Sequence, residues 1–531
     1  MLNARKKDWS FLYPLLLGAC AFFLTVGFAP LNPNNADWIL GRLDPTQHYL
    51  GWLFFRNGPW TFPVGLNPLF GLDLSSSIVY SDSIPLLAIP LKVFDPLLPE
   101  RFQYLGLWIF ACFLLQAWVS WKILGIYSQN TTLKLLGCGL FIFFPPMLWR
   151  INTPAGGHSA LVAHFLILWA IYLILRPTTN KRTLLWIGLL TISVLTHFYL
   201  FAIVSMLWAS DLANHYFIQR DISAKKLTQE SLLALVCVIF LAWQSGYFSI
   251  SASLNNERGY GFYGMNILGP IDSQGWSYIL KSLTKPSSWG EGFSYLGLGI
   301  TIAGITAIMA SIINSRSIDM LKAFSRYRFL IALCIFMTIF AISNHVGIGD
   351  TNFTYSLPPW FLKIADALRS SARLFWPTEY LLIVVFYLAI VRAFPLKISY
   401  AILALCLATQ IVDTSAGWLR NRQELLAQHT IDDHTHNLSN SFWSFAGNHY
   451  DNLIIVPSIN RPPNWEIFST YAIKHKMGTN AIHMARVDLE KEKESNNRLN
   501  EQINNGTFNQ TTLYVIDNRF VIASLANAPK N

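Results

Sequence analysis

The stretch FLYPLLLGACAFFLTVGFA, residues 11–29, indicates which kind of fold the chain forms. Its nineteen residues are mostly apolar and carry no charge, and a helix needs about 20 such residues to cross a bilayer. The run is too long for the apolar core of a signal peptide, and no convincing cleavage site follows it. We therefore expect an uncleaved first membrane span, with the basic segment MLNARKKDW before it on the cytoplasmic side.

The composition of the whole chain also indicates a membrane protein. Of 531 residues, 53% are hydrophobic, 15% aromatic and only 13% charged, whereas a soluble domain carries about 25% charged residues. The net charge of +10 does not indicate a nucleic-acid-binding protein, because Lys and Arg lie mostly in short loops between apolar runs. The six cysteines all lie in apolar runs without a CxxC motif, so we expect neither a disulfide framework nor a cysteine-based metal site.

Further apolar runs predict a mainly α, polytopic membrane protein. A window of about nineteen residues gives about eleven membrane helices, two of them short. The predicted spans are residues 11–29, 102–124, 133–148, 159–175, 184–195, 198–208, 231–248, 293–313, 329–343, 374–391 and 398–412.

The run from Ser83 to Phe94 decides the topology, because it is short and interrupted by Pro85 and Pro90. If this run does not cross the membrane, the basic loops between the spans all fall on the cytoplasmic side with the N-terminus. If it crosses alone, most of them move outside. We therefore expect a re-entrant or interfacial segment, whose backbone must be satisfied by protein or water.

This topology divides the chain into two domains. Residues 1–412 are expected to form the membrane domain, with a long outer loop over residues 30–101. Residues 413–531 are expected to form a small α/β domain outside the cell membrane, because the apolar runs NLIIVP, NAIHMARV and TLYVIDN alternate with helix-like segments, Glu466 to Lys476 and Leu489 to Asn504.

The outer loop begins with RLDPTQHYLGWLFFRNGPW, residues 42–60, in which polar residues stand among Trp and Phe. Asp44 before Pro45 is typical of a helix start, and the aromatic residues suit a helix lying in the headgroup zone. His48, one turn beyond Asp44, would face the same way, which favours a polar ligand instead. Asp82 also precedes a proline, so it is either a helix cap or the second of two site carboxylates.

Other ionisable residues are predicted at the outer ends of spans. Arg150 and His158 flank one outer turn, where Arg150 either snorkels to the headgroups or faces a site. Arg369 and Arg373 stand one helical turn apart, and paired guanidiniums suit a phosphate or an anionic lipid headgroup. His197 is expected to be a hydrogen-bonded core histidine.

Two loops allow a ligand-binding and a structural interpretation. Residues 257–279 combine glycines with tyrosines, which suits either a carbohydrate-facing loop or turns at a membrane interface. The segment QHTIDDHTHN, residues 428–437, offers three histidines and two aspartates, but without a distinctive ligand spacing we expect a solvated linker there.

Taken together, these features resemble the GT-C superfamily of membrane glycosyltransferases. The shared features are a multi-pass core, an acidic residue after the first span in a long outer loop, and a C-terminal soluble domain outside. More narrowly, the motifs DPTQHYLGWLFF, SIVYSDSIPLLAIPL, YGFYGMNILGPIDSQGW and SARLFWP look like a bacterial family of multi-pass proteins of unknown function, over nearly the whole chain.

The resemblance implies an inverting glycosyltransferase at the outer face of the bacterial inner membrane. It would move a sugar from a polyprenyl-phosphate donor to an envelope glycan, lipid or protein acceptor. Asp44 matches the catalytic acid of the first outer loop by position, with Asp82 as the second candidate. Because no tight DxD pair follows the first span, a divalent metal stays open as a cofactor and we predict no metal ligands. Residues expected to hold the leaving phosphate are Arg369 and Arg373, or Arg150, and those expected to position the sugar or the acceptor are Tyr80, His48 and His158.

Two other functions compete with this one. A lipid-glycan transporter would place ionisable groups in mid-membrane and would show related halves with broken helices. A non-catalytic assembly factor would use Asp44 only as a helix cap, which is worth about 1 kcal/mol of stability.

Overall fold

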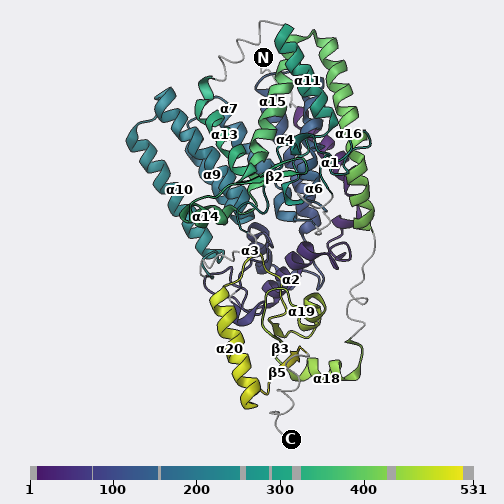
Figure 1. The fold of residues 1–531 in the computed structure, drawn as a ribbon, viewed down its shortest axis with the longest axis vertical. Coiled ribbons are helices and arrows are strands. Elements are labelled where there is room, and N and C mark those ends of the chain that lie inside the picture. The colour runs from purple at the N-terminus through teal and green to yellow at the C-terminus, as the bar shows by residue number, and fades with distance from the viewer. Residues whose placement is uncertain are drawn as a thin grey trace, which may run out of the picture.

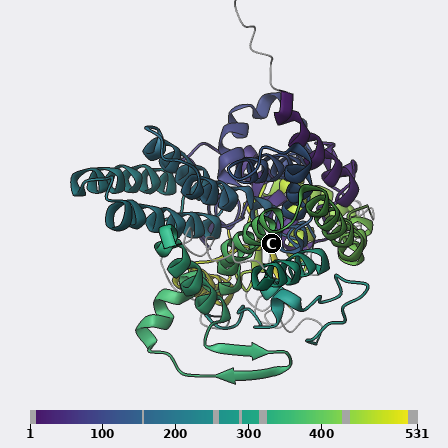
Figure 2. The same cartoon turned by 90° about the horizontal axis from the view of Figure 1, so that it is seen from above.

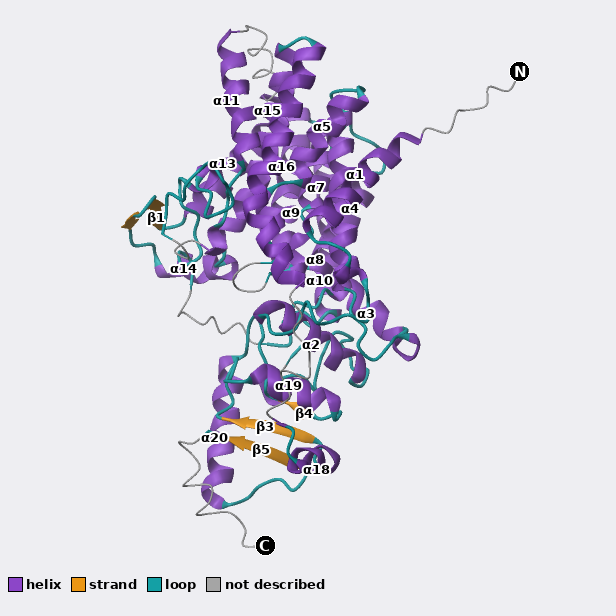
Figure 3. Cartoon of the chain, turned by 90° about the vertical axis from the view of Figure 1, so that its right-hand side faces the viewer, coloured by secondary structure: helices purple, strands orange, loops and turns teal. Residues whose placement is uncertain are grey.

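The computed structural model describes residues 9–74, 76–152, 157–250, 259–285, 290–313, 325–426 and 438–517. Three parts follow one another along the longest axis of the molecule (Figure 1). A bundle of helices forms one end, the first outer loop with α2 and α3 lies next to it, and a small unit of helices and strands forms the other end (Figure 3). The expected mainly helical fold is confirmed.

Every run predicted as a membrane span coincides with helix in the bundle. These helices are α1 (Leu12–Thr25), α4 (Leu105–Gly125), α5 (Thr131–Ile142), α6 (Pro145–Trp149), α7 (Phe165–Leu175), α8 (Arg182–Thr196), α9 (Phe198–Ala213), α10 (Ala224–Gln244), α11 (Leu298–Ile313), α13 (Arg328–Ile342), α15 (Trp376–Ala393) and α16 (Leu396–Leu426).

The number of about eleven spans is not supported, however. Within the described residues, four helical stretches are long and apolar enough to cross a membrane: Leu105–Gly125, Ala224–Gln244, Ser371–Ala393 and Leu396–Leu426. Six further apolar helices have 10–17 residues, and at 1.5 Å per residue they reach about 15–26 Å. Hydropathy windows ignore breaks in a helix. The predicted span 133–148, for example, is divided between α5 and α6 at Pro145.

Small residues allow the bundle helices to approach closely. A Cβ added at Gly18 of α1 would lie 2.7 Å from the carbonyl oxygen of Phe113 in α4. Glycine removes that conflict, as it does at many helix contacts in membranes. By contrast, α10 exposes most of its apolar side chains, including Leu232, Val236 and Phe240, as expected for a helix that faces lipid.

The helix α2 (Leu43–Asn57) is not a surface helix. Every residue from Pro45 to Arg56 is buried, so the expected exposed face in the headgroup zone is absent. Trp52 Nε1 donates a hydrogen bond to the Phe102 carbonyl at 2.9 Å, and Arg56 pairs with Asp95. The helix is therefore enclosed by the rest of the outer loop and by α19 (Trp465–Lys474) of the C-terminal unit.

The loop around Asp82 packs directly on α2. Ser83 Oγ donates to the His48 carbonyl at 2.7 Å, and a side chain at Gly51 would clash with Ser81. Helix α3 (Pro85–Val93) follows and has nine residues. Nine residues rise about 14 Å, so α3 by itself is too short to cross a bilayer core of about 30 Å.

The C-terminal unit is an α/β structure, as predicted. Its parallel sheet has the order β4 (Gly478–Thr479), β3 (Asn452–Val456), β5 (Thr512–Ile516), so NLIIVP and TLYVIDN are strands. The helices are α18 (Ser441–His449), α19 and α20 (Leu489–Asn505). NAIHMARV is not a strand: residues 480–488 form a loop.

That loop, residues 480–488, is bonded to the outer loop through its backbone. Ala485 N donates to the Tyr80 carbonyl at 2.8 Å, and the preceding Thr479 N donates to the Leu69 carbonyl at 2.9 Å. The helix α16 also continues past residue 412 to Leu426. A hairpin of β1 (His345–Ile348) and β2 (Thr351–Thr354), followed by α14 (Pro359–Ala365), projects from the side of the bundle (Figure 2).

Candidate functional site

A cavity of about 670 Å³ lies where the bundle, the outer loop and the C-terminal unit meet. Most of the predicted site residues line it: Asp44, Tyr80, Asp82, His158, Arg369 and Arg373. The C-terminal unit contributes further lining residues, among them Arg461, His483 and Arg486. His48 and Arg150 do not line this cavity.

Asp44 is not a helix cap. It lies in the first turn of α2, but the cap position is Arg42 and no side chain caps the helix there. The Arg42 N–H instead donates to Thr46 Oγ1 at 3.1 Å. Within the described residues, the Asp44 carboxylate has no hydrogen bond or ion pair.

The surroundings of Asp44 favour its protonated form at neutral pH more than water does. Burial raises the pKa of Asp44 to about 7, and the negative charges of Glu291 and Asp82 act in the same direction, against Arg373 and Arg150. A carboxylate with a pKa near neutrality is a stronger base than an ordinary aspartate and still ionises at physiological pH. The pKa of Asp44 is therefore one that suits a general base.

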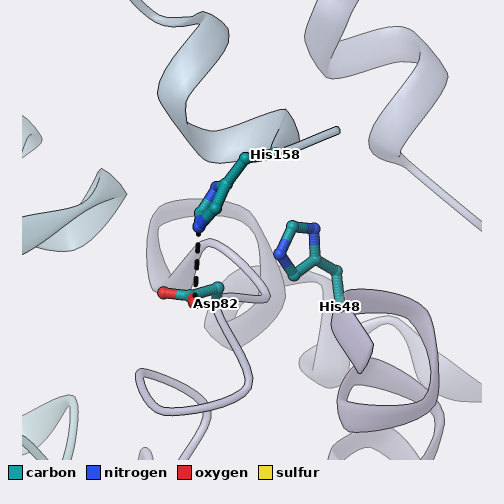
Figure 4. A group of neighbouring side chains, drawn as sticks. All are labelled: His48, Asp82 and His158. Carbon is teal, nitrogen blue, oxygen red and sulfur yellow. Dashed lines mark ion pairs between the residues drawn. The ribbon is translucent and has the colours of Figure 1, made fainter. Parts of the chain in front are cut away.

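Asp82 has different surroundings. Its backbone is left-handed, with a φ of +52°, and it does not cap α3, whose N-terminal cap is Ile84 without a side-chain hydrogen bond. Asp82 Oδ2 lies 3.5 Å from Nε2 of His158 (Figure 4), and Asp82 Oδ1 lies 3.7 Å from Nε2 of His197. The loop turns this carboxylate towards imidazoles.

His48 faces this group rather than the cavity. The centroid of its ring is 4.8 Å from that of His158, and the side chain is fully buried. Burial, followed by the influence of His158, lowers the pKa of His48 to about 3, so its ring is neutral. The expectation that His48 binds a ligand together with Asp44 is not met, because α2 directs His48 towards Asp82 and His158 (Figure 4).

Arg150 belongs to a buried ion cluster. Glu291 Oε2 lies 2.9 Å from Nη1 of Arg150 and 2.8 Å from Nη2 of Arg373. Burial alone would raise the pKa of Glu291, but the two guanidiniums outweigh it and lower that pKa well below its usual value. Arg150 also stacks against Trp149 and Trp376. Arg150 therefore does not snorkel to the headgroups and does not line the cavity. Its guanidinium holds the Glu291 carboxylate in place.

Four guanidiniums line the cavity, those of Arg369, Arg373, Arg461 and Arg486. Arg373 is oriented by Glu291. Arg369 does not stand one helical turn before it, because Ser370 separates two short 3-10 helices, Asp366–Leu368 and Ser371–Phe375. Arg486 Nη2 donates to the carbonyls of Asp366 and Ala367 at 3.3 and 3.1 Å. This concentration of planar cations suits a phosphate group.

Sequence reasoning missed several of these residues. His483 and Arg486 stand in NAIHMARV, where an alternating pattern suggested a strand. Glu291 gave no signal beyond a charged residue between glycines. The signal that could have identified these residues is a polar side chain within an apolar run outside the predicted membrane spans.

The remaining residues singled out in the sequence are His197 and two loops, and only some of them lie at the cavity. His197 Nδ1 accepts a hydrogen bond from Tyr199 N at 3.0 Å, which confirms a hydrogen-bonded histidine although its other nitrogen faces Asp82. Of the loop 257–279, Gly259 and Tyr263 line the cavity, whereas Asp272 accepts a bond from Leu283 N at 2.9 Å within its own loop. The segment QHTIDDHTHN, residues 428–437, lies outside the described residues.

Two family profiles match the chain. Residues 15–415 match the profile described as a domain of unknown function, DUF6311, and residues 442–531 match the profile described as the DUF6311 C-terminal domain. No curated protein and no solved structure matches the chain. Asp44 and Arg373 lie in the first range and Arg486 in the second, so both ranges contribute to one cavity. Because the first match covers more than half of its length, the chain belongs to the DUF6311 family.

Proposed function

We propose that the chain is an inverting membrane glycosyltransferase of the GT-C type. It would transfer a sugar from a polyprenyl-phosphate donor to a hydroxyl of an envelope glycan, lipid or protein at the outer face of the bacterial inner membrane. The observation that supports this most is that one cavity is lined both by the Asp44 carboxylate, which has no partner within the described residues, and by four guanidiniums. A transfer of this kind needs a base at one end and an anion holder at the other.

Asp44 is the proposed base. As the acceptor oxygen forms its bond to the anomeric carbon, the proton of the acceptor hydroxyl passes to Asp44. The bond between that carbon and the phosphate oxygen breaks, and its electron pair leaves with the phosphate. Attack and departure on opposite faces invert the configuration of the anomeric carbon. The raised pKa of Asp44 increases its affinity for the proton that it must take.

Arg369 and Arg373 are the proposed phosphate ligands. Negative charge grows on the phosphate as the sugar leaves, so fixed cations stabilise the transition state more than the bound donor. Glu291 holds Arg373 in place at 2.8 Å. Arg461 and Arg486 extend the cationic wall from the C-terminal unit, and Tyr80 and His158 remain candidates for contacts to the sugar or the acceptor.

The membrane part would supply a path for the donor's hydrocarbon chain. Among the described stretches that are long and apolar enough to cross a membrane, Ser371–Ala393 reaches the cavity through Arg373, which lies in its first turn. A phosphate held there would sit at the membrane surface while its lipid stays in the bilayer. The loop of residues 480–488, which carries Arg486, would contact the same phosphate from the C-terminal unit.

Mass spectrometry of envelope lipids and glycans tests this function. In bacterial cells without the chain, we expect one acceptor to lose the mass of one sugar and a sugar-loaded polyprenyl phosphate to accumulate. Translocation of a labelled glycolipid across vesicles that contain the chain, with no change in its mass, would instead favour a transporter. Identical mass spectra with and without the chain would favour an assembly factor.

A further inference from the structure

The cluster of His48, Asp82 and His158 has a geometry that the proposed transfer does not require. The three side chains come from α2, from the loop before α3 and from the turn before α7, and they point towards one another (Figure 4). One nitrogen or oxygen atom of each lies within 4.8 Å of the others. Two imidazoles and one carboxylate in this arrangement are a set of metal ligands.

The distance between Asp82 and His158 fits two ligands of one metal ion better than a direct hydrogen bond between the two side chains. Asp82 Oδ2 lies 3.5 Å from His158 Nε2, which is beyond the usual 2.7–3.2 Å or so of a hydrogen bond between such atoms. Two ligands bound tetrahedrally to Zn²⁺ at about 2.0–2.1 Å stand about 3.3–3.4 Å apart. The pair of Asp82 and His158 already has about this separation, and His48, whose ligand atom lies within 4.8 Å of theirs, would have to move closer to complete the geometry.

His48 supplies an independent observation. Its side chain is fully buried, yet neither ring nitrogen has a hydrogen-bond partner within the described part of the chain. A buried polar atom without a partner costs about 1–3 kcal/mol, and proteins rarely keep such an atom without a reason. Metal binding through one nitrogen of His48 would remove this cost for that nitrogen. The neighbouring His158 Nδ1 is likewise without a partner in the described part of the chain.

His197 completes the surroundings without being a ligand. Its Nδ1 accepts a hydrogen bond from Tyr199 N at 3.0 Å, so the neutral ring carries its proton on Nε2. That nitrogen faces Asp82 Oδ1 at 3.7 Å. A protonated nitrogen cannot bind a metal, but it can orient the carboxylate that does, as the residues around metal ligands commonly do.

We propose that His48, Asp82 and His158 bind a divalent transition-metal ion, Zn²⁺ by the chemistry of the ligands. Imidazole nitrogens disfavour Mg²⁺ and Ca²⁺, which take oxygen ligands. Three protein ligands leave one tetrahedral position open, as in catalytic zinc sites. Because Asp82 and His158 line the cavity, the open position faces it and would take water or an oxygen of a bound substrate. The site does not depend on the proposed transfer.

Metal content tests this site directly. The full chain, without a polyhistidine tag, is purified in detergent, stripped with EDTA, reloaded with ZnCl₂, desalted and analysed by mass spectrometry of the metal. We expect about one Zn²⁺ per chain in the wild type, and His48→Ala and His158→Ala to lose it on desalting. His197→Ala should keep the ion with an affinity lowered about 10-fold or more. The matched control is His164→Ala, because His164 is equally buried but pairs with Tyr380 outside the cluster.

Two results would overturn the site. One is the absence of saturable ZnCl₂ binding to the wild type in calorimetry, which needs no variant to fold. The other is a folded His48→Ala chain that retains Zn²⁺ as well as the wild type does. Visible absorption of the Co²⁺-loaded wild type gives a further readout, since a tetrahedral site produces strong bands that His158→Ala should abolish.

Discussion

At the scale of single residues, Asp44 and Asp82 show what a local pattern leaves open. Both precede a proline at the start of a helix, and the helices α2 and α3 do begin there. Neither carboxylate caps its helix. Asp44 faces the cavity and has no partner within the described residues, whereas Asp82 faces His158 and His197. The pattern predicts the path of the backbone, but the direction of the Asp82 side chain is related to residues far away in the sequence.

The raised pKa of Asp44 predicts that its removal stabilises the metal-free protein. Below about pH 4 the carboxyl is protonated in both the folded and the unfolded chain, so it contributes nothing to the pH dependence of stability. Between about pH 4 and 7 the unfolded chain loses this proton first, which favours unfolding. Above about pH 7 the penalty is constant and amounts to at most about 4 kcal/mol.

Asp44→Ala should therefore unfold at a higher temperature than the wild type at pH 8 and at a similar one at pH 4, both in EDTA and detergent. Thermal unfolding followed by fluorescence measures this difference. A helix cap behaves in the opposite way, because its loss would lower stability by about 1 kcal/mol. A destabilised variant at pH 8 would count against the proposed base.

Glu291 is predicted to be a structural anchor for Arg373. Glu291→Gln leaves two buried guanidiniums without their counter-charge, which costs about 3 kcal/mol, at the lower end for a broken buried pair. The lower end applies because Glu291 keeps 23% of its side chain exposed. Chemical unfolding measures the loss. The exposed pair of Asp73 and Arg498 is the control, since Arg498→Ala should cost at most about 1 kcal/mol. Equal losses of stability in the two variants would show that Glu291 is not a structural anchor.

At the scale of elements, periodicity and hydropathy predicted which segments are helical better than they predicted where each helix begins and ends. Each predicted apolar run coincides with helix, because a helix satisfies its backbone hydrogen bonds within one segment of the chain. The burial of α2 could not be predicted, since it depends on tertiary packing. The break at Pro145 is a local effect of proline that a hydropathy window ignores. NAIHMARV alternates like a strand, but only Gly478–Thr479 before it pairs with β3, and residues 483–487 of the run line the cavity instead.

The loop of residues 480–488 is predicted to bind the donor phosphate together with the bundle. Arg486→Ala removes a charged hydrogen-bond donor worth about 1.5–3 kcal/mol, so the KM for the sugar donor should rise about 10- to 100-fold with a smaller change in kcat. Steady-state transfer in detergent measures both constants. Arg498→Ala, on α20 away from the cavity wall, should leave them unchanged; an unchanged KM in Arg486→Ala would remove this loop from the donor site.

At the scale of the whole molecule, the cavity exists only because three parts of the chain meet. The bundle supplies Arg373, the outer loop supplies Asp44, and the C-terminal unit supplies Arg486. The sequence indicated the first two as candidates and missed the third, because residues of separate matched ranges show no common pattern. The backbone bond from Ala485 to Tyr80 holds the C-terminal unit against the outer loop.

The proposed topology is testable independently of activity. If the cavity faces outward, the C-terminal unit lies outside the cytoplasm and the loop at Asn130 lies inside, because Lys122 and Lys134 flank it. An alkaline phosphatase fusion after residue 450 should be active, and one at Asn130 inactive, with the reverse pattern for a fluorescent-protein fusion. Activity of the phosphatase at Asn130 alone would invert the topology and contradict the proposed location of the reaction.

The central claim, that Asp44 activates the acceptor hydroxyl, is tested most directly by one comparison of masses. Cells that lack the chain are complemented with wild type, Asp44→Asn or Asp37→Asn, and their envelope glycans and lipids are analysed by mass spectrometry at matched amounts of folded protein. Asp37 lies in the same outer loop but not on the cavity wall. We predict that wild type and Asp37→Asn restore the missing sugar and that Asp44→Asn does not; restoration by Asp44→Asn would contradict the account.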